Sequence, residues 1–140
     1  MRTPPAYQPR MLHRIFSPSA PKPIGPYNQA VRSGEFVFCS GQVGLDPATA
    51  ALVEGGIAAQ THQVLRNLKA VLTASGLSLD DVVKTTIYLV DLADFSAVNE
   101  AYGQHFGALP PARSTIGVVA LPLGARVEID AIAIGPSSGP

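Results

Sequence analysis

Apolar residues recur along this chain with two different periods, and each period predicts one kind of element. Between residues 57 and 72 they return every three or four positions, which is typical of an amphipathic helix, here ending near Gly76. A second helix is predicted from Asp94, as its N-cap, to about Gly107. Its apolar stripe consists of Phe95, Val98, Tyr102 and Phe106.

The remaining apolar segments are short and rich in β-branched residues, which predicts strands. We expect these strands at residues 29–32, 36–40, 83–91, 114–119 and 125–134. Ser33-Gly34-Glu35 suits a hairpin turn between the first two strands, and residues 78–81 suit a short capped turn. The predicted order is β-β-α-β-α-β-β, an α+β fold in which two helices cover one face of one sheet.

The other face of this sheet needs a partner. Strands at 83–90 and 127–134 carry apolar residues on both faces, which argues against a face left in water. Charged residues make up only 14% of the chain, against about 25% in typical soluble proteins. Since no stretch approaches the roughly 20 apolar residues of a membrane-spanning helix, we predict a homo-oligomer and no membrane partner.

Length and charge narrow the class of protein further. The 140 residues suit one compact domain. Residues 1–32 hold five basic residues and no acid, whereas residues 33–140 hold five basic and ten acidic residues. The folded body is therefore expected to be mildly anionic, which disfavours nucleic acid as a main partner.

The first sixteen residues are rich in proline and lack the apolar core of a secretory signal. We predict a disordered or loosely docked tail at residues 1–16, followed by a single domain at residues 17–140. Met11 is an alternative start. The lone cysteine, Cys39, fits a reducing compartment, so a cytoplasmic location is expected.

Two kinds of site are not expected from the sequence. Cys39 follows an apolar run and has no histidine near it in sequence, which favours a small buried hydrophobe over a nucleophile. The chain offers no metal-ligand spacing and no glycine-rich phosphate loop, so neither a metal site nor a phosphate-binding loop is expected. The histidines concerned are His13, His62 and His105.

Arg113 is the strongest single candidate for binding chemistry. It follows Pro110 and Pro111 at the start of a predicted strand, so its backbone leaves the turn in a fixed direction. A planar guanidinium suits a carboxylate, which it holds by two parallel charge-assisted hydrogen bonds. The alternative is a surface arginine or an ion pair between subunits.

The segments on both sides of Arg113 resemble the C-terminal signature of the reactive-intermediate deaminase family, RidA, also called YjgF-like. These are residues 111–114 and 118–133, and similar family patterns occur in order at residues 24–27, 40–42, 67–72, 83–86 and 94–99. Together they span the chain from about residue 17 to residue 136. The resemblance implies a chorismate-mutase-like α+β fold, a homotrimer and sites in the clefts between subunits.

The resemblance also implies an activity. Members hydrolyse short-lived 2-enamine and 2-imine acids, such as 2-aminoacrylate, to 2-keto acids and ammonia. The chain would then be a cofactor-free 2-iminobutanoate/2-iminopropanoate deaminase that detoxifies reactive metabolites. Two alternatives stay open: a non-catalytic trimeric module that binds small 2-keto acids, and a ribonuclease or chaperone like those described in the same family.

By the same resemblance, Arg113 holds the substrate carboxylate and Glu128 positions the attacking water. The implied substrate-binding residues are Tyr27, Ser40, Gly41, Asn99 and Thr115. Thr115 stands where many deaminating members have cysteine. That change matters little if the position acts through its backbone carbonyl, and much if it acts through a thiol.

Each of these positions also has a plain structural interpretation. Arg126, Glu128 and Asp130 alternate on one face of a strand, where they would form a solvated or mutually paired row of charges. Tyr27 would be a packed aromatic ring, and Asn99 a surface amide. Ser40 and Gly41 would form a tight turn.

Overall fold

The computed structural model describes residues 2–4 and 12–136. Two α-helices, α1 (Gly56–Ala74) and α2 (Phe95–Gly103), accompany a six-stranded sheet. The strands are β1 (Leu12–Ile15), β2 (Ala30–Ser33), β3 (Phe36–Val43), β4 (Val82–Leu89), β5 (Ala112–Gly117) and β6 (Val127–Ile134). Three short 3₁₀ helices occur in the connections, η1 (Leu79–Asp81), η2 (Leu92–Asp94) and η3 (Pro122–Gly124).

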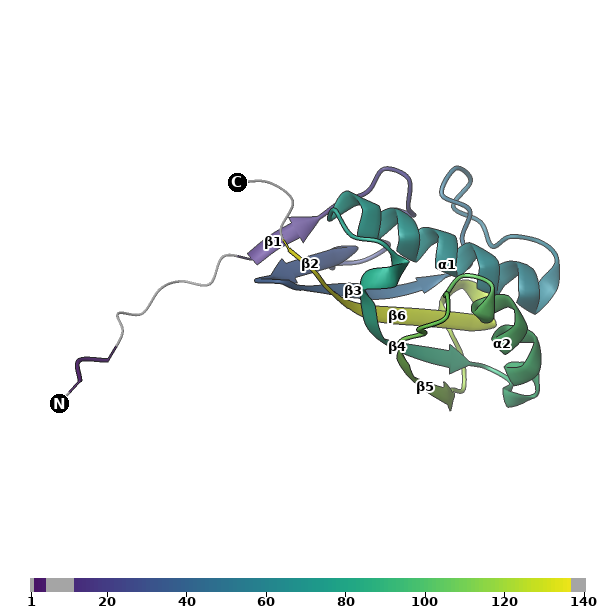
Figure 1. The fold of residues 1–140 in the computed structure, drawn as a ribbon. Helices are drawn as coiled ribbons and strands as arrows, with labels where there is room; N and C mark the ends of the chain where they lie inside the picture. The colour runs from purple at the N-terminus through teal and green to yellow at the C-terminus, as the bar shows by residue number, and fades with distance from the viewer. Residues whose placement is uncertain (1, 5–11, 137–140) are drawn as a thin grey trace.

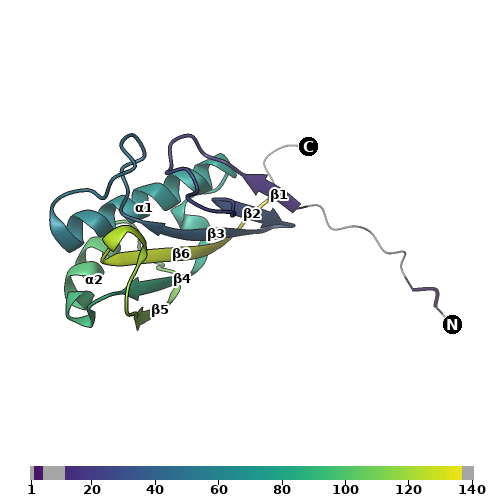
Figure 2. The ribbon, with the colours of Figure 1, turned by 180° about the vertical axis from the view of Figure 1, so that it is seen from behind.

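The sheet is mixed, with the strand order β1-β2-β3-β6-β4-β5. All neighbouring strands are antiparallel except β4 and β5, which are parallel and joined through α2. Both helices lie on the same face of the sheet (Figure 1). Figure 2 shows the opposite face, which neither helix covers. The predicted α+β arrangement of one sheet with two helices on one face is confirmed.

The core fills the space between the helices and the covered face of the sheet. Alternate residues of β6 are buried there, because successive side chains of a strand point to opposite faces. They pack with one face of α1, which repeats at helical spacing. The central members are Val64, Leu65, Leu68, Leu72, Val127, Ile129 and Ala131. In the described part of the chain, no helix is long and apolar enough to cross a membrane.

The structure corrects the predicted start of the domain. Residues 12–15, which we assigned to the tail, form β1 and pair in antiparallel register with β2. The four residues of β1, Leu-His-Arg-Ile, carry no clear alternation of apolar and polar side chains, and only Ile15 is buried. The order therefore begins with three strands instead of two. The tail prediction for residues 1 and 5–11 falls outside the described residues.

The second helix is shorter than predicted. It ends at Gly103, a poor helix former, although Phe106 still packs on Tyr102 with ring centroids 4.6 Å apart. Asp94 occupies the N-cap position but makes no side-chain cap. Its carboxylate instead accepts hydrogen bonds from Arg126 at 2.8 and 2.9 Å.

Candidate active site

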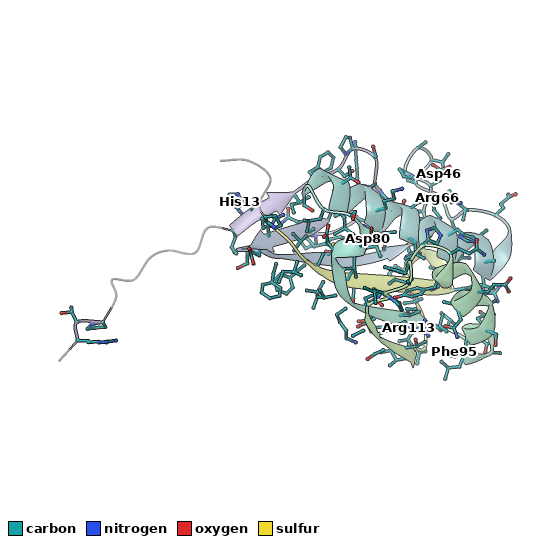
Figure 3. The ribbon with its side chains drawn as sticks, in the orientation of Figure 1. His13, Asp46, Arg66, Asp80, Phe95 and Arg113 are labelled. Atoms are coloured by element: carbon teal, nitrogen blue, oxygen red, sulfur yellow. The ribbon has the colours of Figure 1, made fainter. Side chains whose placement is uncertain are left out.

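Arg113 lies in β5 on the helix-covered face, where side chains from one side of α2 contact its guanidinium. Its Nη2 donates to Asn99 Oδ1 at 2.6 Å. Its Cζ lies over the rings of Phe95 and Tyr102, 5.5 and 5.0 Å from their centroids. Figure 3 shows Phe95 and Arg113 near each other where α2 meets the β5 edge of the sheet. We call Arg113, Phe95, Asn99 and Tyr102 the arginine cluster.

The charge of Arg113 has no carboxylate partner among the described residues. The ion pair found in that part of the chain joins Arg126 to Asp94. The guanidinium of Arg113 is held by an amide oxygen and two aromatic rings, all of them uncharged. Such a cation remains available for an anionic ligand.

Thr115 lies two residues after Arg113 and is on the same face of β5. Its Oγ1 is buried and has no hydrogen-bond partner in the described structure. A buried hydroxyl without a partner is costly, so this oxygen is a polar group that a ligand or another subunit would satisfy. The resemblance also pointed to this position, where many deaminating family members have cysteine.

Glu128 lies in β6 on the opposite face, next to an irregularity of β3. Cys39 pairs with Ala131 and Gln42 pairs with Ile129, so Ser40 and Gly41 together face the single residue Asp130. This is a β-bulge, which bends the strand locally and redirects side chains. It brings the backbone of residue 41 against the carboxylate of Glu128.

Glycine at residue 41 leaves the room that the Glu128 carboxylate occupies at this contact. A Cβ at residue 41 would lie 2.7 Å from Oε2 of Glu128 and 2.8 Å from its carboxyl carbon. Together with Tyr27, these two residues line a small pocket of about 50 Å³ whose wall includes Pro21, Pro23, Ile24 and Pro122. We call it the glutamate pocket. Its volume suits one or two water molecules.

The surroundings of Glu128 raise the pKa of its carboxyl group. Burial raises the pKa of its carboxyl group, and the negative charge of Asp130 raises that pKa further. Asp130 is held in place by Tyr88, whose hydroxyl donates to it at 2.8 Å. A glutamate of this kind exchanges a proton more readily near neutral pH than an exposed one does.

The segment that carries Tyr27 is tied down by buried Gln29. The Gln29 amide accepts from the Ser17 N–H at 2.6 Å and donates to the carbonyls of Ser17 and Pro21. Ser40 also fixes this segment, since its hydroxyl donates to the Asn28 carbonyl at 2.6 Å and its N–H to the Gln29 carbonyl at 2.9 Å. Both donors of Ser40 are therefore used within the chain.

The candidate residues thus form two groups instead of one. Arg113 pairs with Thr85, whose side chain is buried under α2, whereas Glu128 pairs with Tyr88, three residues further along β4. An odd separation along a strand places two side chains on opposite faces. Within one chain, the arginine cluster with Thr115 and the glutamate pocket with Ser40 lie on different sides of the sheet.

Sequence reasoning missed the second role of Phe95 and Tyr102, which it placed only in the core stripe. Their spacing from Asn99, four residues before it and three after it, was the available signal, because it puts all three on one helix face. Gln29 gave no signal. Arg126 pairs with Asp94 and not with Glu128, so the charge row of β6 is not internally paired.

Cys39 is buried, as predicted, and burial raises its pKa to about 12, which keeps the thiol protonated. His62 Nδ1 and His105 Nε2 lie 2.8 Å apart. Within residues 2–4 and 12–136, however, no three histidine, cysteine, aspartate or glutamate side chains form a group that would hold a metal ion.

Comparison with known proteins identifies close relatives over nearly the whole domain. Residues 17–135 match the family described as endoribonuclease L-PSP. The chain is 57% identical to Protein DfrA of Myxococcus xanthus, over 86% of this chain and 93% of that protein. It is 46% identical to the human 2-iminobutanoate/2-iminopropanoate deaminase, over 90% of this chain and 93% of the relative. The crystal structure of Escherichia coli TdcF with bound serine superposes with a TM-score of 0.83 at 39% identity, covering 88% of this chain and 98% of that one.

Proposed function

This chain belongs to the endoribonuclease L-PSP family, which includes the RidA and YjgF-like proteins, and we propose that it hydrolyses reactive 2-imine acids to 2-keto acids and ammonia. The names of its relatives support imine deamination as the general chemistry. Relatives with other names, such as Protein DfrA, are more similar in sequence. The choice of 2-iminobutanoate, 2-iminopropanoate or another imine acid is therefore part of the proposal.

One observation carries this proposal: a guanidinium that is rigidly held and lacks a carboxylate partner in the described structure. Arg113 is contacted by two rings and an amide oxygen, which fix its position without neutralising its charge. A small acid would bind it by parallel hydrogen bonds to its carboxylate. Binding in this way orients the neighbouring imine carbon, which is already electrophilic and needs no cofactor for attack.

Glu128 supplies the proton transfer. In the proposed reaction the oxygen of a water in the glutamate pocket bonds to the imine carbon while one of the water's protons passes to the Glu128 carboxylate. The carboxyl group then returns a proton to the nitrogen of the tetrahedral adduct. The hydroxyl proton of the adduct then passes through the same carboxylate to this nitrogen, so that the C–N bond breaks, ammonia leaves and the keto group forms. The raised pKa of Glu128 suits both transfers, because the group is neither too weak a base nor too weak an acid.

These two residues act on one substrate only if a second subunit supplies one of them. Arg113 and Glu128 lie on opposite faces of the sheet in one chain, so each active site would combine the arginine cluster of one subunit with the glutamate pocket of its neighbour. The uncovered sheet face supports such an assembly, because Phe36, Phe38 and Ile116 are each about 45% exposed there. We propose that this face is buried in a homotrimer.

The activity is tested by coupling the protein to a dehydratase that generates 2-aminoacrylate and measuring imine decay and ammonia release. Arg113→Ala is expected to abolish the acceleration. Arg113→Lys keeps the positive charge but loses the planar guanidinium that binds a carboxylate by two hydrogen bonds. It should therefore recover only a small part of the acceleration. Normal turnover by the alanine variant would refute the role of Arg113, and absence of turnover by the wild type would refute the deaminase.

A non-catalytic binding module is the second possibility, because the same arginine would serve it equally well. Glu128→Gln separates the two functions. A deaminase loses rate in this variant but still binds a 2-keto acid in calorimetry, whereas a pure binder has no wild-type rate to lose.

A further inference from the structure

The arginine cluster is unusual in how it restrains a cation. Phe95, Asn99 and Tyr102 project from one side of α2, and all three contact the guanidinium of Arg113. The distances of 5.5 and 5.0 Å from Cζ to the two ring centroids lie within the roughly 6 Å range of cation–π attraction.

The two rings differ in how firmly they are held. Tyr102 is buried, its hydroxyl lies 2.8 Å from Thr85 Oγ1, and its ring packs on Phe106. Phe95 is 42% exposed and occupies the first position of α2. Tyr102 is therefore a fixed support inside the core, whereas Phe95 is a removable contact at the surface.

Aromatic restraint leaves the binding edge of the arginine free. A carboxylate partner would occupy the N–H groups at the edge of the guanidinium and would compete with an acidic substrate. A ring attracts the cation through its quadrupole without taking up those donors. Of the five N–H donors of Arg113, the described structure uses one, in the bond to Asn99.

We propose that Phe95 and Tyr102 are positioning residues that hold the Arg113 guanidinium ready for the substrate carboxylate. This inference rests on the proposed function and adds to it the device that orders the carboxylate-binding group. The rings act through Arg113 and need not touch the substrate.

The decisive variant is Phe95→Leu, because an exposed side chain can be replaced without emptying the core. We expect the dissociation constant of a 2-keto acid, pyruvate, to rise about two- to fivefold, as expected for one partly exposed cation–π contact. The KM for the imine should rise by the same factor with kcat nearly unchanged, since the carboxylate is held equally in the ground state and the transition state. Phe95→Tyr should restore both values, and Phe16→Leu, at an exposed phenylalanine away from Arg113, is the matched control.

A second measurement does not depend on activity. In NMR spectra, the Nε–H resonance of Arg113 should carry a ring-current shift in the wild type that diminishes in Phe95→Leu and persists in Phe95→Tyr. Unchanged ligand binding and an unchanged Nε–H resonance in Phe95→Leu would overturn the inference, as would a loss confined to kcat. A wild type that neither binds pyruvate nor hydrolyses the imine would instead overturn the proposed function, while the resonance would still report on the ring contact.

Discussion

Arg113 and Glu128 leave the sheet in opposite directions, because Arg113 pairs with Thr85 on β4 and Glu128 pairs with Tyr88. The two side chains therefore cannot meet on one small molecule within a single subunit. This relationship makes the composition of the proposed active site directly measurable.

Mixed oligomers of two inactive variants should regain activity. Arg113→Ala and Glu128→Gln subunits are co-refolded in equal amounts, so that about a quarter of the sites combine an intact arginine with an intact glutamate from different subunits. We expect about 25% of the wild-type rate. Separately refolded variants mixed without exchange are the control, and no recovery in the mixed oligomers would mean that one subunit supplies both residues.

Gly41→Ala should impair hydrolysis more than binding. The new Cβ would lie 2.7 Å from Glu128 Oε2, so the carboxylate must move from its position in the pocket. Displacement of about 1 Å costs up to a hundredfold in rate, and we expect a loss of ten- to hundredfold in kcat with pyruvate affinity retained. Gly103→Ala is the matched control, because nothing lies within 4 Å of its added Cβ.

The rate should depend on pH through Glu128. Water activation requires its carboxylate form, so kcat/KM should fall as the pH drops through the raised pKa of this residue. Asp130→Asn removes the neighbouring negative charge, which lowers the pKa of Glu128 and moves the acid limb of the profile to lower pH. An acid limb at the same pH in both proteins would contradict this account.

The fold was predictable where the apolar pattern was long, and less so where it was short. The helix at residues 57–72 was recognised from its periodicity, and the strands at 83–90 and 127–134 from apolar runs rich in β-branched residues. The strand β1 was missed because its four residues show no alternation of apolar and polar side chains. Neither the parallel register of β5 on β4 nor the bulge at Ser40 and Gly41 leaves a local signal.

For this reason the residues of the candidate site were predictable one by one, but their division between two faces was not. That division follows from pairings between strands distant in sequence. The local sequence singled out Arg113, the resemblance gave Arg113 and Glu128 their expected roles, and only the strand register places the two on opposite faces.

Arg32 should be essential for stability although it is far from the candidate site. It is buried, and its guanidinium donates to the carbonyls of Ser75, Gly34 and Gly135, which joins the end of α1 to the end of β6. Arg32→Met leaves these acceptors unsatisfied, and we expect the free energy of unfolding to fall by about 3 kcal/mol in denaturant titrations. Arg66→Met, at an exposed arginine with one side-chain hydrogen bond, should change it little.

The His62–His105 pair should make stability depend on pH. Burial lowers the pKa of His105, and the charges of His62, Arg66 and Lys69 lower it further. The unfolded chain takes up this proton at the ordinary histidine pKa of about 6.5, whereas the folded chain resists it. The contribution of neutral His105 to the free energy of unfolding is therefore complete above about pH 6.5, the unfolded pKa. It is lost as the pH falls through the lowered pKa of His105 in the folded chain.

Thermal unfolding at several pH values measures this effect. His105→Gln should show a shallower loss of stability from pH 7 to pH 5 than the wild type, and His13→Gln, at an exposed histidine in β1, should not. Equal slopes in all three proteins would exclude the pair as the cause.

The one extra residue of β3, at the Ser40–Gly41 bulge opposite Asp130, would make the proposed hydrolysis separable from ligand capture. A descendant chain that lost one residue here would pair β3 with β6 without a bulge. The carboxylate of Glu128 would then lose the room that it occupies beside Gly41. The guanidinium anchored by α2, on the far side of the sheet, would be untouched. Evolution from an enzyme to a metabolite sensor would then need only a small deletion at one place.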